Sequence, residues 1–308
     1  MRIILSGASG LIGSRFEELL FESHDIIPLS SEHGVDITNQ ASLAEFFLGK
    51  GVDVVIHLAG LTDVDACELD REDDMSHLAI DPVDILNLDV KNLYSDDWKD
   101  KKTTFAVNSI GTKNLYEVAT KSGAKFVYIS SDFVFSGKEG PYNEESTPNP
   151  VDWYGMTKYF GEKVVDTASN LIVRLSFPYG HQSPVKKDVV WKLYDILSSR
   201  KEVNLISDQI ITPTFIDDII YGLDFLLSKN ATGIYHLTGS SSASPMQIGE
   251  KIKEVFSLST KIEPCHLEDV YKDKAPRPLK SVMESKKIAN LGFKTKTFDE
   301  GLALIATT

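Results

Sequence analysis

The stretch ILSGASGLIGSRFEELL, residues 4–20, decides the fold. It runs from a short apolar segment into an amphipathic helical pattern, with Gly7, Gly10 and Gly13 in the spacing Gly-x-x-Gly-x-x-Gly between them. The early glycines let the backbone turn tightly and approach a phosphate, and the last lets the helix pack on the strand. The N–H groups and dipole of the helix N-terminus favour the same anion. On the first strand of an alternating chain, this loop predicts a dinucleotide site.

Apolar runs and helical stretches alternate along the chain. The pattern RIIL is followed by DIIPL, DVVIHLA, KFVYIS, LIVRLS and EVNLI, with helix-like segments between them. This order predicts an α/β fold with a doubly wound, Rossmann-type parallel sheet. Past residue 177 the pattern becomes irregular and rich in proline, with helices expected near 188–199, 215–228 and 245–256. We therefore expect a dinucleotide-binding domain at 1–176, to which 206–228 return, and a smaller C-terminal substrate lobe formed mainly by 177–205 and 229–308.

Composition excludes several classes of partner. With 45 acidic and 32 basic side chains the net charge is −13, which repels nucleic acid and anionic membranes. No segment reaches the roughly 18 apolar residues of a membrane span. The two cysteines, Cys67 and Cys265, match no metal or redox spacing. We expect a cytoplasmic protein without a disulfide scaffold, a nucleic-acid partner or a membrane partner.

Residues 63–100 interrupt the alternation. They carry 13 acidic and 3 basic side chains and show no clean period. A charge run of this kind is typical of a solvated surface insertion. A functional lid is the alternative.

The end of the second predicted strand bears on cofactor choice. Ser30 and Ser31 stand where an NAD enzyme often has an acid for the ribose 2′-hydroxyl. An uncharged strand end tolerates a 2′-phosphate, and Arg15 could pair with it, whereas Glu32 favours NADH. We expect NADPH, with NADH as the alternative.

The spacing Tyr-x-x-x-Lys occurs twice, as Tyr154 with Lys158 and as Tyr159 with Lys163. Residues four apart share a helix face, but the two pairs lie roughly 140° apart around the helix. Only one pair can therefore point into a given site. The first pair begins the helix after the Gly- and Pro-rich loop 136–153, where a side chain can reach a cleft, and packing suffices to explain the second.

A carbonyl that is reduced by hydride must also receive a proton. A free tyrosine has a pKa near 10, and a neighbouring ammonium should bring the pKa of Tyr154 down towards neutrality. Lys158 could do this and also hold ribose hydroxyls. Ser130 and Ser131, at the end of the run VYISS, could supply a hydroxyl to the same carbonyl oxygen.

A set of motifs in order along the chain resembles the extended short-chain dehydrogenases/reductases, and among them the dTDP-4-dehydrorhamnose reductases. The motif Tyr-Gly-x-Ser/Thr-Lys-x-x-x-Glu is matched by Tyr154, Lys158 and Glu162. Further matches cover nearly the whole chain: VDITN at 35, HLAGLTDVDACE at 57, AVNSIGTKNL at 106, SSDFVF at 130, GPYNEES at 140, RLSFPYG at 174, SDQIITPTF at 207 and RPLKSV at 277.

The resemblance implies roles for individual residues. Ser131, Tyr154 and Lys158 would form the catalytic set, and Asp132 and Phe133 would meet the sugar. Phe133 and Phe177 replace a tyrosine and a tryptophan of the family, which removes a hydroxyl and an indole that could touch sugar. The implied cofactor residues are Gly7, Ser9, Gly10, Leu11, Ile12, Gly13, Asp36, Ile37, Leu58, Ala59, Gly60, Thr62, Asn108, Ser130, Tyr154 and Lys158.

The resemblance implies NADPH-dependent reduction of the 4-keto group of a nucleotide-linked 6-deoxy sugar. The alternative is a non-catalytic NADP-binding regulatory subunit, similar to the β subunit of methionine adenosyltransferase. The expected partner is a nucleotide-sugar substrate, a homodimer is compatible with the sequence, and we expect no metal. His57 and His236 lie in apolar runs and are predicted to be core histidines. Lys186 and Lys187 could reach the diphosphate or form a solvated basic pair.

Overall fold

The computed structural model describes residues 1–183 and 186–307. The chain divides into two compact units. Unit 1 comprises Met1–Val134, Pro148–Val173 and Ala231–Ile234, and unit 2 comprises Phe135–Thr147, Arg174–Asn230 and Tyr235–Thr308. The domain boundaries expected from the sequence, with 1–176 and 206–228 in one domain and 177–205 and 229–308 in the other, stay a prediction.

A six-stranded sheet in the order β2-β1-β3-β4-β5-β9 forms the centre of unit 1. The first strands pair in parallel, with Ile3 beside Ile26 and Val54, and with Val55 beside Phe126. Its strands are β1 (Arg2–Ser6), β2 (Asp25–Leu29), β3 (Val54–His57), β4 (Lys125–Ser131), β5 (Leu171–Leu175) and β9 (Gly233–His236).

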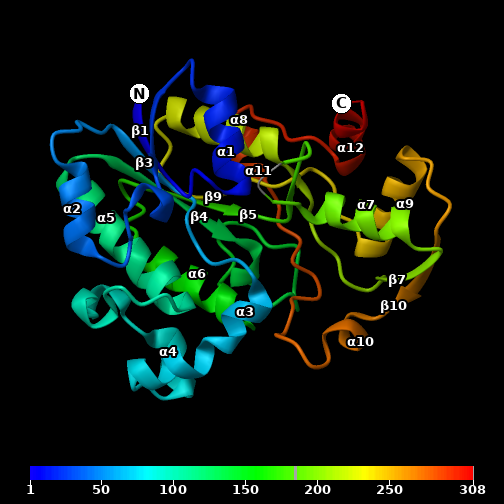
Figure 1. The fold of residues 1–308 in the computed structure, drawn as a ribbon, viewed down its shortest axis with the longest axis horizontal. Helices are drawn as coiled ribbons and strands as arrows, with labels where there is room; N and C mark the ends of the chain where they lie inside the picture. Colours follow the sequence, from blue (N-terminus) through cyan, green and yellow to red (C-terminus); the bar gives the residue numbers. More distant parts are fainter. Residues whose placement is uncertain (184–185, 308) are drawn as a thin grey trace. The chain divides into compact units, whose positions relative to one another are not determined.

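Helices of unit 1 cover both faces of this sheet. Figure 1 shows α1 on one face and α2, α5 and α6 on the other. The helices are α1 (Leu11–Leu20), α2 (Gln40–Phe47), α3 (Val64–Leu69), α4 (Arg71–Leu78), α5 (Gly111–Lys121) and α6 (Trp153–Val164). The shorter turns are η1 (Ser31–His33), η2 (Pro82–Asn87), η3 (Val90–Asn92), η4 (Ser95–Trp98), η5 (Ala106–Ile110) and η6 (Asp132–Val134).

The core of unit 1 follows from the apolar runs. Ile4, Val55 and Phe126 on neighbouring strands are fully buried and pack with Leu43 of α2 and Leu115 of α5. Strands that are buried on both faces need continuous apolar sequence, which explains why the runs do not alternate. The carboxyl ends of the parallel strands therefore meet at one edge of the sheet, where ligands bind in folds of this kind.

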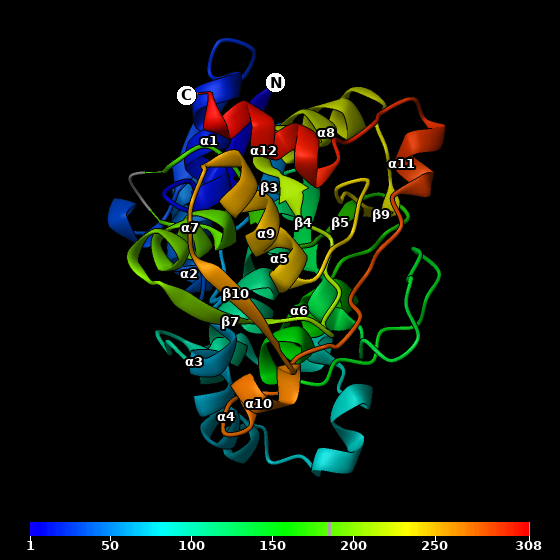
Figure 2. The ribbon, with the colours of Figure 1, turned by 90° about the vertical axis from the view of Figure 1, so that its right-hand side faces the viewer.

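Unit 2 is built on two small sheets. Strand β7 (Glu202–Ile206) pairs in parallel with β10 (Lys261–Cys265), and helices α7 (Val189–Ser199) and α9 (Pro245–Val255) lie against them (Figure 2). Strand β6 (Pro178–Tyr179) pairs with β8 (Thr214–Phe215). The other helices are α8 (Ile216–Ser228), α10 (Leu267–Tyr271), α11 (Lys286–Asn290) and α12 (Phe298–Ala306).

The predicted fold class is confirmed, and the three predicted C-terminal helices correspond to α7, α8 and α9. The run EVNLI is a strand, but it belongs to a two-stranded sheet of unit 2, and the short segment β9 takes the last place in the main sheet. Within 1–183 and 186–307, no helix combines the length and apolar character needed to cross a membrane.

Candidate active site

The loop between β1 and α1 has the shape of a phosphate cradle. Gly7 has φ of +74°, and a Cβ there would lie 2.7 Å from the backbone nitrogen of Ala59. A Cβ on Gly13 would overlap the carbonyl oxygen of Gly7. Helix α1 begins after a glycine, so its first N–H groups are left for an anion. The residues predicted to contact the dinucleotide here fit a pyrophosphate: Gly7, Ser9, Gly10, Leu11, Ile12 and Gly13.

Asn108 holds the loop that follows β3. Its Nδ2 donates to the carbonyl of Leu61 at 3.0 Å, and its Oδ1 accepts from the nitrogen of Leu61 at 2.8 Å. Nδ2 also donates to Thr157 Oγ1 at 3.1 Å, and that hydroxyl donates to the carbonyl of Tyr154 at 2.9 Å. Asn108 lies in η5, a π-helical turn, which is a rare element frequent at functional sites. It links the helix of Tyr154 to the loop of the predicted cofactor residues Leu58, Ala59, Gly60 and Thr62.

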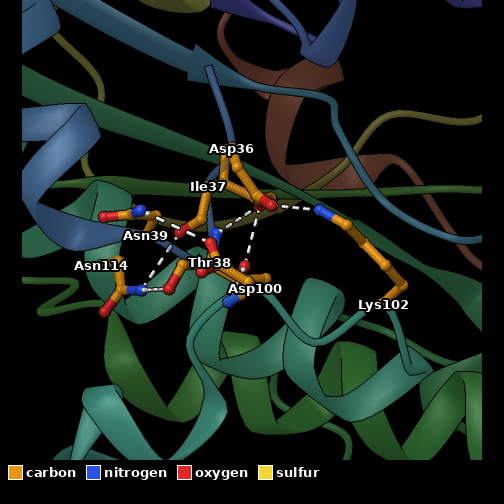
Figure 3. Close-up of polar contacts among 7 residues, drawn as sticks. All are labelled: Asp36, Ile37, Thr38, Asn39, Asp100, Lys102 and Asn114. Atoms are coloured by element: carbon orange, nitrogen blue, oxygen red, sulfur yellow. Dashed lines mark hydrogen bonds and ion pairs between the residues drawn. The ribbon is translucent and has the colours of Figure 1, made fainter. Parts of the chain in front are cut away.

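The loop after β2 is tied to the end of the acidic segment, as Figure 3 shows. Asp36 Oδ1 accepts from Thr38 N at 2.9 Å and from Thr38 Oγ1 at 2.8 Å, and Oδ2 forms an ion pair with Lys102. Burial alone would raise the pKa of Asp36, but the hydrogen bonds from Lys102 and Thr38 outweigh it and lower the pKa. Both carboxylate oxygens already accept hydrogen bonds. A hydroxyl of a bound cofactor that donates to Asp36 would therefore share Oδ1 with Thr38 or Oδ2 with Lys102.

Other contacts fix the backbone of the same loop. Asn114 Nδ2, on α5, donates to the carbonyls of Ile37 and Thr38, both at 3.1 Å (Figure 3). The nitrogen of Asp100 donates to Thr38 Oγ1 at 3.1 Å, and Asn39 Nδ2 donates to Asp100 Oδ1 at 3.4 Å. The predicted cofactor residue Ile37 is therefore held from α5, and the two residues that follow it are held from Asp100.

Ser131 and Tyr154 come together where β4 ends and α6 begins. The ring of Tyr154 packs edge-on against Phe133, with ring centroids 5.6 Å apart. Loss of contact with bulk water raises the pKa of Tyr154, and the nearby Ser131 hydroxyl opposes the shift without cancelling it. The phenol therefore keeps its proton, beside a hydroxyl. The neighbouring Ser130 has a buried hydroxyl oxygen with no hydrogen-bond partner among the described residues, as a ligand-binding group would.

Lys158 follows Tyr154 by one helical turn and is buried. Its Nζ lies 4.3 Å from the ring centroid of Tyr128, in a cation–π contact. Burial lowers the pKa of Lys158 to about 7, although Glu162 acts in the opposite direction. We predicted that a charged Lys158 would lower the pKa of Tyr154. That prediction is wrong for the chain by itself, because burial dominates the pKa of both groups.

The chain matches the RmlD substrate binding domain family over residues 1–84 and 97–308. It belongs to this family. The spore coat polysaccharide biosynthesis protein SpsK of Bacillus subtilis is 28% identical over 305 residues, which cover 98% of this chain and 95% of SpsK. The methionine adenosyltransferase 2 subunit beta of Xenopus laevis is 30% identical over 200 residues, which cover 62% of this chain and 59% of that protein.

A solved structure is similar over almost the full length. The dTDP-4-dehydrorhamnose reductase of Bacillus anthracis, in complex with NADP, superimposes with a TM-score of 0.82 at 27% identity, covering 99% of this chain and 98% of that chain. The RmlD family consists of NAD(P)-dependent sugar-nucleotide reductases of the extended short-chain dehydrogenase/reductase type. The resemblance predicted from the motifs is confirmed.

The RmlD match leaves out residues 85–96, inside the acidic segment. Most residues of 81–100 are exposed, as predicted for a surface insertion, but three apolar side chains anchor it. Ile85, Val90 and Trp98 are at most 5% exposed and share an apolar cluster with Phe105 and Trp153. The segment therefore packs on η5 and α6 (Figure 1), because its few apolar residues are buried there while its exposed carboxylates remain in water.

The second Tyr-Lys pair has a structural role in this packing. Lys163 Nζ donates to the carbonyl oxygens of Leu86 at 3.0 Å and Leu88 at 2.7 Å. The same atom lies 5.8 Å from the ring centroid of Tyr159. The prediction that this pair serves packing is confirmed, but its partner is the acidic segment.

The residues predicted to meet the sugar lie in both units. Asp132 and Phe133 belong to η6 and are at most 8% exposed, and Ser131 Oγ donates to Asp132 Oδ1 at 3.2 Å. Phe177 belongs to unit 2 and has φ of +39°, a conformation that bulky residues rarely adopt. Backbone strain of this kind concentrates at functional sites. Contact of these residues with a sugar stays a prediction.

His57 and His236 are fully buried core residues, as predicted. Both ring nitrogens of His57 lie within 3.0 Å of a hydroxyl, and burial lowers the pKa of each histidine to about 3. Among the described residues no group of His, Cys, Asp and Glu has the arrangement of a metal site. Lys187 forms an exposed ion pair with Asp195, which favours the basic-pair alternative for this residue.

Three contacts of the site were not predicted from the sequence. They join Lys102 to Asp36, Asp74 to Trp153, and Lys163 to the carbonyls of residues 86 and 88. They were not predicted because the acidic run was interpreted as solvated charge. The pattern gave no signal for them, since the apolar residues Ile85, Val90 and Trp98 follow neither a helical nor a strand period.

Proposed function

We propose that this chain reduces the 4-keto group of a nucleotide-linked 6-deoxy sugar with NADPH. The observation that carries the proposal is the arrangement at the carboxyl end of β4, where Ser131 ends the strand and the ring of Tyr154, which keeps its proton, packs edge-on against Phe133. A protonated phenol near a hydroxyl suits a carbonyl oxygen that must receive a proton. Membership of the RmlD family supports the substrate class.

In this mechanism Tyr154 donates its proton to the carbonyl oxygen as negative charge develops there, and Ser131 hydrogen-bonds the same oxygen. A raised pKa does not impede this step, because an alkoxide is more basic than a phenolate. Lys158 would hold ribose hydroxyls and, when protonated, stabilise the phenolate left on Tyr154. When bound, a reduced nicotinamide supplies the hydride.

NADPH is the proposed cofactor, with NADH as the alternative. Ser30 and Ser31 leave the end of β2 uncharged, and the Bacillus anthracis relative was crystallised with NADP. Arg15 forms an ion pair with Glu18 at 2.7 Å, so a 2′-phosphate would compete with this carboxylate for the guanidinium. Equal catalytic efficiency with both cofactors would remove the preference.

A regulatory subunit is the second candidate. It is favoured by the similarity to the methionine adenosyltransferase 2 subunit beta, together with Phe133 and Phe177 in place of the family's tyrosine and tryptophan. In that case the chain would bind NADP without turning over a sugar. The presence of Ser131, Tyr154 and Lys158 together favours the enzyme.

The test mixes purified protein with NADPH and enzymatically generated dTDP-4-keto-6-deoxy sugar and follows nicotinamide absorbance. Tyr154→Phe is the matched control, since it removes one hydroxyl and keeps the ring against Phe133. Oxidation by the wild type that is lost in the variant supports the reductase. No oxidation on any 4-keto nucleotide sugar, with tight NADPH binding and a partner protein that co-purifies, would replace it with the regulatory subunit.

A further inference from the structure

Three carboxylates, from α3, from α4 and from the cap residue between these helices, accept hydrogen bonds at two helix beginnings. Glu68 Oε2 accepts from the nitrogen of Trp153, the first residue of α6, at 2.8 Å. Asp70 Oδ2 accepts from the nitrogen and the hydroxyl of Thr104, at 2.8 and 2.7 Å. Asp74 Oδ2 accepts from the nitrogen of Phe105 and from the indole Nε1 of Trp153, both at 2.9 Å. Thr104 and Phe105 directly precede η5, so these acids bind the first N–H groups of both helices.

Asp74 fixes the indole of Trp153 in one orientation. The carboxylate is 1% exposed and the indole is equally buried. Phe105 stacks on the indole with centroids 6.3 Å apart, and the Arg71 guanidinium lies 5.8 Å from its ring centroid. A single oxygen of Asp74 thus connects the beginning of η5, which carries Asn108, with the residue directly before Tyr154.

Helix α6 does not need Asp74 in order to form. Its own N-cap, Asp152, accepts from the nitrogen of Gly155 at 2.8 Å, and Glu68 accepts from the first N–H group. The bond from Asp74 goes to a side chain, so it adds nothing to the helical hydrogen bonds. It instead ties the first residue of α6 to the beginning of η5. Burying a carboxylate costs free energy unless well-placed hydrogen bonds compensate it. The position of Phe105 N and of the indole relative to Asp74 therefore matters.

We propose that Asp74 is a positioning residue for Tyr154, acting through the indole of Trp153. The proposal rests on the proposed reductase function, because it concerns the placement of the proton donor. Tyr154 shares its peptide bond with Trp153, so a tilt of the indole displaces the phenol from the Ser131 hydroxyl. A displacement of about 1 Å at a reacting group can lower turnover by about 100-fold.

The experiment compares Asp74→Asn, Asp74→Ala and Trp153→Phe in the full chain. Asn retains an acceptor oxygen for Phe105 N and the indole, Ala removes it, and Phe removes the indole donor together with part of the buried ring. Asp81→Ala is the matched control, because Asp81 is an exposed carboxylate of the same segment that caps η2 through Val83 N. The kcat, the KM for each substrate, and hydrogen exchange of residues 152–158 are measured on folded protein.

We expect Asp74→Ala and Trp153→Phe to lower kcat by about 10- to 100-fold while the KM for NADPH changes less than about twofold. Asp74→Asn should stay within about threefold of the wild type, and Asp81→Ala should match it. Amide exchange in the first turn of α6 should be faster in Asp74→Ala and in Trp153→Phe, and unchanged in Asp74→Asn and Asp81→Ala. The double variant Asp74→Ala/Trp153→Phe should be no slower than the slower single variant, because the indole bond that Trp153→Phe removes is one of the two bonds that Asp74→Ala already breaks.

Three outcomes would overturn the proposal. In the first, Trp153→Phe turns over like the wild type, a result that holds even if Asp74→Ala fails to fold. In the second, the effects of the two substitutions multiply in the double variant. In the third, the Asn variant is as slow as the Ala variant. A wild-type chain with no turnover would instead refute the reductase function itself, so the two failures are distinct.

Discussion

Replacing Lys158 by methionine should remove most of the pH dependence of stability above neutrality. In the folded chain burial lowers the pKa of Lys158 to about 7, whereas its ordinary value is 10.5. Between these values the unfolded chain binds more protons than the folded chain, so the free energy of unfolding of the wild type rises with pH across this window. From pH 7 to pH 9 the rise is about 2 kcal/mol for this one group.

Urea unfolding of the cofactor-free chain at pH 7, 8 and 9 measures this slope. Trp98 and Trp153 lie in unit 1, so a Trp191→Phe background confines tryptophan fluorescence to that unit. A chain of two units need not unfold in one step, and this signal isolates the relevant transition. Lys121→Met, at the exposed end of α5, is the control for loss of one charge.

As the pH falls from 9 to 7, the free energy of unfolding of the wild type should fall by about 2 kcal/mol relative to that of Lys158→Met. The variant is therefore relatively more stable at pH 7 than at pH 9. Lys121→Met should follow the wild type. Parallel lines for wild type and Lys158→Met would refute the reasoning, because they would mean that Lys158 titrates alike in the folded and unfolded chains. The variant should also lose sugar reduction.

Three further predictions concern the packing around α6 and the cofactor loop. Gly155→Ala should lower kcat and should lower the free energy of unfolding by about 1–3 kcal/mol, because a Cβ there would overlap the carbonyl oxygen of Phe133. An active variant with the wild-type melting temperature would contradict this. Lys163→Met should speed hydrogen exchange of residues 82–92 and destabilise the chain by about 1 kcal/mol, since the carbonyls of Leu86 and Leu88 lose their donor. Unchanged exchange would show that the contact is dispensable. Lys102→Ala should raise the KM for NADPH by a few-fold and the KM for NADH by less. The reason is that the substitution leaves the charge of Asp36 uncompensated near the cofactor loop. Equal changes of the two KM values would show that Lys102 has no effect on the 2′-phosphate.

The parts of the fold that could be predicted are those that one local pattern determines. The glycine loop needs small residues at fixed places, and the structure places the backbone of Ala59 where a side chain on Gly7 would have to go. The long apolar runs need burial on both faces, so their strands were predictable. Strand β9 was not, because four residues carry too little pattern to separate it from a loop. The pKa of Tyr154 was mispredicted because spacing gives a neighbour but not the depth of burial that opposes it.

The acidic segment shows why composition alone misled. Its carboxylates fall into two groups that the sequence does not distinguish. Asp81 and Asp89 are exposed and cap their own short turns, through Val83 N and Lys91 N. Glu68, Asp70 and Asp74 instead reach across to the beginnings of η5 and α6, where free N–H groups and the helix dipole favour negative charge. Both helices carry residues of the candidate site, so acids that look like solvated charge hold the N-terminal ends of two elements on which the chemistry depends.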